Sequence, residues 1–231
     1  MSKAAAPPTA AERRRVRTIL NRLRKRFGDL TPPRAVDPLD ELILTVLSQH
    51  TSDLNAERAF ADLRSAFPGG WGEIEAAATE AVADAIRSGG LANSKAPRIQ
   101  AILHEVRDRE GGYDLASLRD LPDAEARSYL MTLPGIGPKT AAVVLSFALG
   151  RDTLPVDTHV HRVSRRLGLI PPKASAERAD RILHDLVPDG LRTPVHVAFI
   201  RLGRETCKAP TPRCRTCPLN DICPTAPRYL G

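Results

Sequence analysis

The chain has 231 residues, 42% hydrophobic and 26% charged, which is the balance of an ordinary globular protein long enough for one or two domains. Aromatic residues make up only 4%, which disfavours a β-sandwich or barrel, and a formal net charge of +7 favours a polyanionic partner such as nucleic acid. Because no apolar run approaches the ~20 residues that span a membrane and no apolar signal core follows the start, we expect a cytoplasmic protein.

The chain begins with a segment of low complexity, and we expect residues 1–14 to form a disordered tail. Apolar residues then recur at helical spacing from Val16 to Phe27, while arginine and lysine cover the other faces. This pattern predicts a basic amphipathic helix that ends near Gly28. We expect most of its charges to form a solvated face that attracts DNA through its field rather than by direct contact.

Further helices follow a proline-rich linker between Thr31 and Pro38. Helical periodicity, interrupted by glycine and proline, predicts them over residues 39–47, 55–67, 73–87, 99–106, 125–131, 158–168, 175–187 and 193–205. Asp53 is the expected N-cap of the second of these helices. Because no stretch alternates as a strand does, the sequence predicts an all-α fold.

The most informative stretch is Leu133-Pro134-Gly135-Ile136-Gly137-Pro138-Lys139-Thr140. Two glycines one residue apart can adopt positive φ and expose their amides, and the helix that follows presents free N–H groups to an anion. Proline suits the first position of that helix. An ordinary turn between helices explains glycine and proline alone, but not this spacing ahead of Lys139. We therefore predict a clamp for a DNA phosphate.

Four cysteines lie within the last 25 residues, in the pattern C-x6-C-x2-C-x5-C; they are Cys207, Cys214, Cys217 and Cys223. A secreted disulfide scaffold would spread its cysteines over the fold, so a single tight group indicates a metal site. A structural zinc site usually pairs two C-x2-C units, whereas four thiolates can equally hold a [4Fe–4S] cluster. The spacing alone leaves both possibilities open.

Together these motifs resemble the endonuclease III family of DNA glycosylases. Leu133 to Ala141 is similar to its helix–hairpin–helix, Val156 to Val160 to its Gly/Pro-rich loop with a catalytic aspartate, and the cysteine spacing to its iron–sulfur loop. The resemblance covers residues 15–225. It implies a six-helix bundle-like domain over residues 38–152 and a second helical domain, built from residues 15–37 and 153–231, that carries a [4Fe–4S] cluster.

The resemblance also implies the site residues. Lys139 would be a nucleophile for C1′ of the sugar, and Asp157 a carboxylate that stabilises positive charge on it. The helix N-terminus and partial burial are expected to disfavour the charged form of the Lys139 amine. The cysteines would hold the cluster, with the amino-terminal helix beside it. The implied DNA contacts are Gln49, His50, Leu91, Gly135, Gly137 and Thr140.

Two of these contacts lie in loops that would enter the duplex. Leu91 suits an apolar wedge. The other loop is the one in which many family members have a glutamine that fills the vacated space. In this chain His50 stands at that position, and Gln49 comes one residue earlier. The sequence leaves open which of the two fills the gap. His161 also departs from the family, which frequently has an apolar or aromatic residue there.

The function implied is that of a monomeric, bifunctional DNA glycosylase/AP lyase of base excision repair, associated with the nucleoid. It would bind double-stranded DNA with damaged bases or abasic sites, remove oxidised pyrimidines and cut the strand by β-elimination. One alternative is a monofunctional mismatch glycosylase, which would not need Lys139. The other is a non-catalytic helix–hairpin–helix DNA-binding module, which would not need Asp157.

Overall fold

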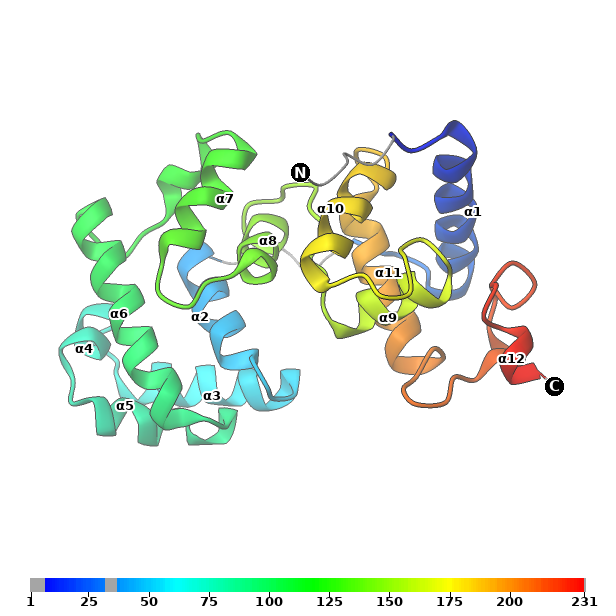
Figure 1. Ribbon diagram of the computed structural model, residues 1–231. Coiled ribbons are helices and arrows are strands. Elements are labelled where there is room, and N and C mark those ends of the chain that lie inside the picture. The colour runs from blue at the N-terminus through cyan, green and yellow to red at the C-terminus, as the bar shows by residue number, and fades with distance from the viewer. Residues whose placement is uncertain (1–6, 32–36, 231) are drawn as a thin grey trace. The chain divides into compact units, whose positions relative to one another are not determined.

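A computed structural model of the protein describes residues 7–31 and 37–230. These residues form α-helices and short 3-10 turns and contain no β-strand, so the predicted all-α fold is confirmed. The chain divides into two compact units, coloured along the sequence in Figure 1. We call Arg34–Arg151 the hairpin unit, and Met1–Pro33 together with Asp152–Gly231 the cysteine unit. Part of the predicted linker, residues 32–36, lies outside the described residues.

The hairpin unit is built around α2, whose apolar residues lie on nearly every face. Leu42, Ile43 and Val46 of this helix are fully buried, and α2 packs against α3, α6 and α8. The α-helices of this unit are α2 (Pro38–Ser48), α3 (Asp53–Ala66), α4 (Trp71–Ala76), α5 (Thr79–Ala85), α6 (Ala92–Glu110), α7 (Asp123–Thr132) and α8 (Pro138–Phe147), and its 3-10 turns are η1 (Arg87–Gly89) and η2 (Ala116–Arg119).

The helix predicted over residues 73–87 is divided into α4 and α5. The reason is a side chain from elsewhere: Gln100 Nε2 donates to the carbonyls of Ile74 (3.1 Å) and Ala77 (2.8 Å), and Gln100 Oε1 accepts from Thr79 Oγ1 (2.7 Å). These bonds satisfy carbonyls that an unbroken helix would have used. The division gives the described part of the hairpin unit seven α-helices, one more than the six expected.

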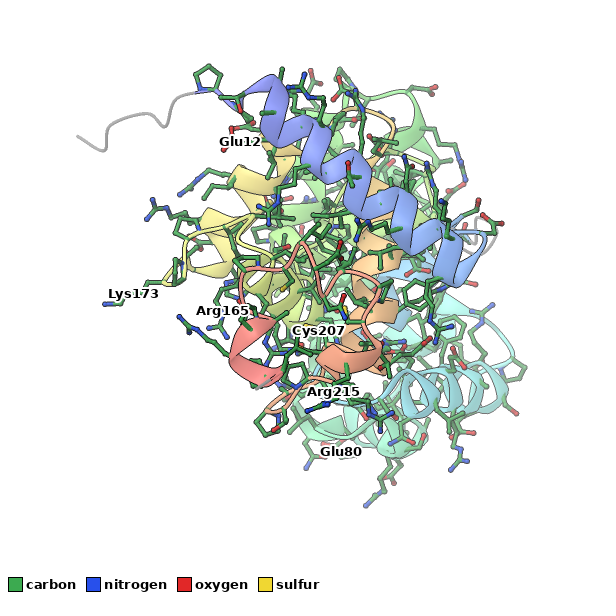
Figure 2. All side chains as sticks on the ribbon, turned by 90° about the vertical axis from the view of Figure 1, so that its right-hand side faces the viewer. Glu12, Glu80, Arg165, Lys173, Cys207 and Arg215 are labelled. Carbon is green, nitrogen blue, oxygen red and sulfur yellow. The ribbon has the colours of Figure 1, made fainter. Side chains whose placement is uncertain are left out.

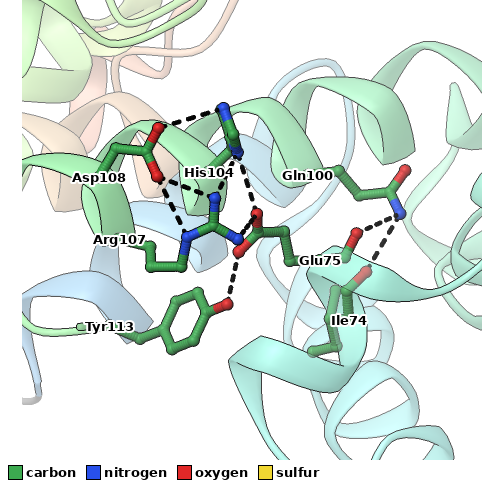
Figure 3. A network of polar contacts seen from close by, with 7 residues as sticks. All are labelled: Ile74, Glu75, Gln100, His104, Arg107, Asp108 and Tyr113. Atoms are coloured by element: carbon green, nitrogen blue, oxygen red, sulfur yellow. Dashed lines mark hydrogen bonds and ion pairs between the residues drawn. The ribbon is translucent and has the colours of Figure 1, made fainter. Parts of the chain in front are cut away.

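A polar network joins α4 to α6 beside this division (Figure 3). The Glu75 carboxylate, only 10% exposed, accepts from Arg107 Nη1 (2.5 Å) and Tyr113 Oη (2.5 Å), and its Oε1 lies 3.1 Å from His104 Nδ1. Burial raises the pKa of Glu75, but the hydrogen bonds of Tyr113 and His104 and the charge of Arg107 lower it, and the net pKa lies below its ordinary value. The network therefore favours an ionised Glu75.

The cysteine unit begins with α1 (Ala10–Phe27), which starts before the predicted boundary, so residues 10–14 of the expected tail are helical. Thr9 and Glu12 explain the early start, because they form a capping box in which each side chain accepts the other's backbone N–H. Residues 1–6 of that tail lie outside the described residues. The other helical elements of this unit are α9 (Thr158–Arg166), α10 (Ala176–Leu186), α11 (Arg192–Glu205), η3 (Cys214–Thr216) and α12 (Pro227–Leu230).

The core of the cysteine unit lies between α1, α9 and α11, with α1 beside α11 in Figure 1. Ile19 and Leu23 of α1 and Phe199 of α11 are fully buried. Gly203 lets α11 approach α9 closely, since a Cβ at this position would lie 2.9 Å from Cβ of His159. The pairing of α1 with α11 joins the two ends of the chain in one core.

Candidate functional site

The stretch from Leu133 to Gly137 joins α7 to α8 in the hairpin unit. Gly135 adopts the left-handed backbone expected for it (φ 72°). Gly137 does not: it is extended (φ −97°, ψ 177°) and forms the N-cap of α8, where its carbonyl accepts from the Ala141 N–H (3.0 Å). The prediction of positive φ at both glycines is therefore wrong for Gly137, because a helix N-cap requires an extended residue.

The two glycines also differ in the space around them. A Cβ on Gly135 would lie 2.7 Å from Nε of Arg98, so a side chain from α6 occupies the space beside this residue. A Cβ on Gly137 would meet nothing within 4 Å. Gly135 is thus explained by the fold itself, whereas neither backbone angle nor packing within the protein requires glycine at position 137.

Lys139 lies in the first turn of α8 and is exposed, so the expected partial burial is not found. The N-terminal position of Lys139 is as predicted, beside helix amides that have no intrahelical acceptor. Thr140 is only 5% exposed, so its side chain offers little surface to a phosphate. The first turn of α8 therefore presents a free amine next to an anion-binding helix end.

Two loops of the hairpin unit carry strained residues. In the described part of the chain, the residues other than glycine with a left-handed backbone are His50 (φ 58°) and Leu91 (φ 50°). This conformation costs an L-residue about 1–2 kcal/mol. His50 is exposed and Leu91 is 58% exposed, whereas Gln49 is half-buried and its Oε1 accepts from Nη1 of Arg98 (3.0 Å). The exposed tip of the first loop is thus His50 rather than Gln49.

Sequence reasoning missed two residues of α6, Lys95 and Arg98, that contact these loops. Lys95 is 2% exposed, and burial, followed by the nearby charge of Arg98, lowers its pKa. A signal for Lys95 was present in the sequence. It stands four residues before the buried Ile99, on the apolar stripe that continues through Ile102 and Val106, where a lysine is out of place.

Asp157, in the cysteine unit, is half-buried and caps α9, and its Oδ1 accepts from the N–H of Val160 (2.7 Å). The loop before it is held against α11, since Nδ1 of the buried His196 lies 2.8 Å from the Pro155 carbonyl. His161, the departure from the family pattern, lies 2.8 Å from the Ala174 carbonyl through Nε2. The aspartate therefore has a fixed position at the N-terminus of α9.

The four cysteines line one cavity of the cysteine unit, together with Arg166, Leu202, Leu219 and Ala226. Burial, followed by the charges of the three other sulfurs, raises the pKa of Cys217 to about 11, which requires that the four sulfurs lie near one another. Within residues 7–31 and 37–230, no three His, Cys, Asp or Glu side chains converge as a single metal ion requires. Four thiols around a common cavity are donors that suit a thiophilic metal centre.

Arginines hold the cysteine loop in place. The buried Arg166 donates through Nη1 to the carbonyl of Lys208 (2.7 Å) and to Sγ of Cys207 (3.4 Å). Arg22 of α1 pairs with Asp221 (2.5 Å), so the amino-terminal helix lies against this loop. Other basic side chains, among them Arg165, Lys173 and Arg215, extend outward from the unit (Figure 2).

Comparison with known proteins identifies the family. Residues 43–189 match the model of the HhH-GPD superfamily of base excision DNA repair proteins. The chain is 35% identical over 190 residues to the endonuclease III of Thermotoga maritima, a match that covers 82% of this chain and 84% of that one. The chain belongs to the endonuclease III family of DNA glycosylases. It is accordingly a base excision repair DNA glycosylase/AP lyase.

Two further proteins show how much of the chain is similar to known glycosylases. A solved endonuclease III, trapped as a covalent intermediate with DNA, has a TM-score of 0.83 and 31% identity, covering 95% of this chain and 99% of that one. A DNA glycosylase-like protein of Arabidopsis thaliana is 36% identical over 172 residues, which are 74% of this chain but only 58% of that protein.

Among the described residues, no helix is long and apolar enough to cross a membrane.

Proposed function

We propose that this endonuclease III family member is bifunctional, with Lys139 as the nucleophile and Asp157 as the carboxylate that stabilises charge on the sugar. Its substrates are damaged bases, with oxidised pyrimidines preferred, and abasic sites in double-stranded DNA, which it binds as a monomer. The observation that carries the proposal is the exposed amine of Lys139 in the first turn of α8, directly behind the glycine hairpin. A relative with 31% identity has been trapped as a covalent intermediate with DNA.

In the first step the neutral amine of Lys139 attacks C1′, and the bond from C1′ to the base breaks. The base leaves with the bonding electrons and takes up a proton. Opening of the sugar ring then gives a Schiff base between Nζ and C1′. Loss of a proton from C2′ next expels the 3′ phosphate by β-elimination, which cuts the strand on the 3′ side of the lesion. Hydrolysis of the imine returns the free lysine.

Asp157 acts before the strand is cut. As the base departs, positive charge develops on the sugar, and an ionised carboxylate stabilises that charge. One oxygen of Asp157 is occupied by the Val160 N–H, and this bond orients the second oxygen. The cap and the catalytic role thus use different oxygens of one carboxylate.

The glycine hairpin grips the DNA backbone. A phosphate approaching the N-terminus of α8 would pass the open side of Gly137, where the missing Cβ leaves space that nothing in the protein fills. The exposed Leu91 then acts as an apolar wedge. His50, the exposed tip of its loop, enters the space left by the flipped nucleotide.

The cysteine loop holds a [4Fe–4S] cluster through Cys207, Cys214, Cys217 and Cys223, which all line one cavity. Bound there, the cluster would fix the loop and leave its arginines facing DNA. Its presence is tested on purified protein by assay of iron and acid-labile sulfide, with Cys214→Ser as the variant expected to lose both. Zinc with no sulfide in the intact protein would contradict this assignment.

The proposed chemistry is tested with Lys139→Gln on duplexes that each contain one defined lesion. The variant should retain duplex binding but lose strand cleavage, since glutamine offers no nucleophilic amine. Cleavage that persists in Lys139→Gln would disprove the role of the lysine. Base release without cleavage by the intact protein would instead favour a monofunctional glycosylase, and binding without either would favour a non-catalytic module.

A further inference from the structure

Lys95 is a buried lysine at the centre of the hairpin unit. It is 2% exposed, and its Nζ donates to the carbonyls of Leu47 (2.6 Å) and Gly89 (2.9 Å). In the described part of the chain, no carboxylate pairs with it. A buried amine without a counter-ion is costly to the fold, so its presence calls for an explanation beyond packing.

The two carbonyls that Lys95 binds terminate helical elements. Leu47 is in the last turn of α2, and Gly89 is the last residue of η1. Such carbonyls lack an intrahelical donor and carry the negative end of the helix dipole, so they are suitable partners for an ammonium group. One side chain of α6 therefore joins the ends of two elements that are distant in the sequence.

Each of these ends leads directly into a strained loop. His50 follows Leu47 by three residues, Leu91 follows Gly89 by two, and both have a left-handed backbone. Lys95 is also bound to the second loop through its own N–H, which donates to the Leu91 carbonyl (3.0 Å). Strained backbone persists only where its surroundings fix it, and here Lys95 supplies contacts to both loops.

Arg98, one turn further along α6, extends this arrangement. Its Nη1 donates to Oε1 of Gln49 (3.0 Å), which holds the residue before His50. Its Nε lies only 2.7 Å from where a Cβ of Gly135 would be, so the same guanidinium lies against the glycine hairpin. One face of α6 thus contacts both strained loops and the hairpin, all within the hairpin unit.

We propose that Lys95 and Arg98 form a loop brace, a pair of positioning residues that holds the His50 loop, the Leu91 loop and the glycine hairpin in the arrangement needed to open a duplex. The brace touches neither DNA nor the reacting atoms. It fixes the two side chains that enter the duplex before DNA binds. The entropy cost of ordering them is therefore not part of the binding step. This inference rests on the proposed function, since it assumes that the three segments meet DNA.

The test compares Lys95→Met, which removes the amine but keeps the length of the side chain, with Gln100→Met as a matched control. Gln100 lies on the same helix and also donates to carbonyls at helix ends, that of Ile74, drawn in Figure 3, and that of Ala77. Its contacts are with α4 and the α4–α5 junction rather than with the loops. Both variants lose hydrogen bonds from α6, but only one loses the brace.

The readout is the ratio of strand cleavage at an abasic site in duplex DNA to cleavage of the same site in single-stranded DNA, which has no base pair to open. Lys95→Met should lower this ratio by about tenfold to a hundredfold, the effect expected from a misplacement of about 1 Å. Gln100→Met should keep the wild-type ratio. A 2-aminopurine base opposite a non-cleavable abasic analogue should also show less unstacking with Lys95→Met than with Gln100→Met.

Equal ratios for the two variants would overturn the proposal. Should Lys95→Met fail to fold, Arg98→Met serves instead, because the half-exposed Arg98 can be changed without leaving a cavity in the core. Arg98→Met should also lower the ratio of duplex to single-stranded cleavage. A wild-type ratio for this variant would overturn the proposal of a loop brace. Failure of the proposed function is distinct from either result, since the wild-type protein would then cleave neither duplex nor single-stranded DNA.

Discussion

At the scale of single residues, we expect Gly135 to matter for the stability of the fold and Gly137 for the binding of DNA. Gly135→Ala should destabilise the fold by about 1–2 kcal/mol, because alanine resists a left-handed backbone and its Cβ would displace Arg98. Gly137→Ala should leave stability within about 0.5 kcal/mol of wild type, since the residue is extended and its side is open. Urea unfolding of both variants measures this difference.

Binding should show the opposite order. Gly137→Ala should weaken affinity for a duplex with an abasic analogue by about tenfold, the weight of one hydrogen bond from a helix amide to a phosphate. Fluorescence anisotropy at fixed salt gives the affinities, since phosphate contacts depend on ionic strength. If Gly137→Ala binds as the wild type does, the phosphate does not approach the hairpin from this side.

Two substitutions can separate the capping role of Asp157 from its proposed catalytic role. Asp157→Asn keeps an oxygen for the Val160 N–H, so stability should change by less than about 1 kcal/mol. It removes the charge, and the rate of base release should fall by about 10²–10³-fold. Asp157→Ala should show the same fall in the rate of base release, and it should also lose about 1 kcal/mol of stability because the helix cap is removed. Base release at the wild-type rate by Asp157→Asn would reduce Asp157 to a capping residue.

At the scale of elements, helical periodicity predicted most helices, and the differences have physical causes. The early start of α1 was predictable, because Thr9 and Glu12 have the spacing of a capping box. The N-cap of α3 is Ser52 rather than the expected Asp53, a shift of one residue. The division of residues 73–87 into α4 and α5 was not predictable, since it depends on Gln100, a residue more than 20 positions away.

The network between α4 and α6 predicts how stability depends on pH. Because the folded pKa of Glu75 lies below its ordinary value of 4.5, the unfolded chain binds more protons at mildly acidic pH. The stabilisation by Glu75 is therefore present above about pH 4.5 and is lost as pH falls through the lower, folded pKa. Glu75→Gln should cost about 1–3 kcal/mol at pH 7.

Urea unfolding from pH 7 down to the acid limit checks this dependence. The gap between wild type and Glu75→Gln should narrow as the carboxylate becomes protonated. Glu80→Gln provides the control, since Glu80 is exposed on α5, and its curve should remain parallel to wild type. A constant gap for Glu75→Gln over the whole range would show that the network does not depend on the charge of Glu75.

At the scale of the whole molecule, the candidate site residues that the sequence can indicate are those that belong to local motifs. Gly135 and Lys139 lie within a few residues of each other, and the cysteines are close together, so their patterns are readable along the chain. The contacts of Lys95 and Arg98 with the start of the His50 loop were missed because those partners are remote: Lys95 reaches Leu47 across 48 positions and Arg98 reaches Gln49 across 49. Such contacts appear only when the chain is folded.

The cysteine unit shows the same limit, because it is assembled from both ends of the chain. Arg15 of α1 donates to the Leu167 carbonyl (2.5 Å) and Arg22 to Asp221 (2.5 Å), across 152 and 199 positions. The sequence identified these arginines as a solvated basic face. In the structure some of them instead bind the segments around the cysteine loop, so charge composition alone overstates how many are free to meet DNA.

The central claim is that Lys139 forms a covalent bond with DNA, and borohydride trapping tests it most directly. Wild-type protein, incubated with a duplex containing an oxidised pyrimidine and sodium borohydride, should give a stable protein–DNA adduct by reduction of the Schiff base. Mass spectrometry of the digested adduct should place the sugar on Lys139, and Lys139→Gln should give no adduct. An absent wild-type adduct, under conditions in which a known lyase is trapped, would contradict the account, as would an equal adduct from Lys139→Gln.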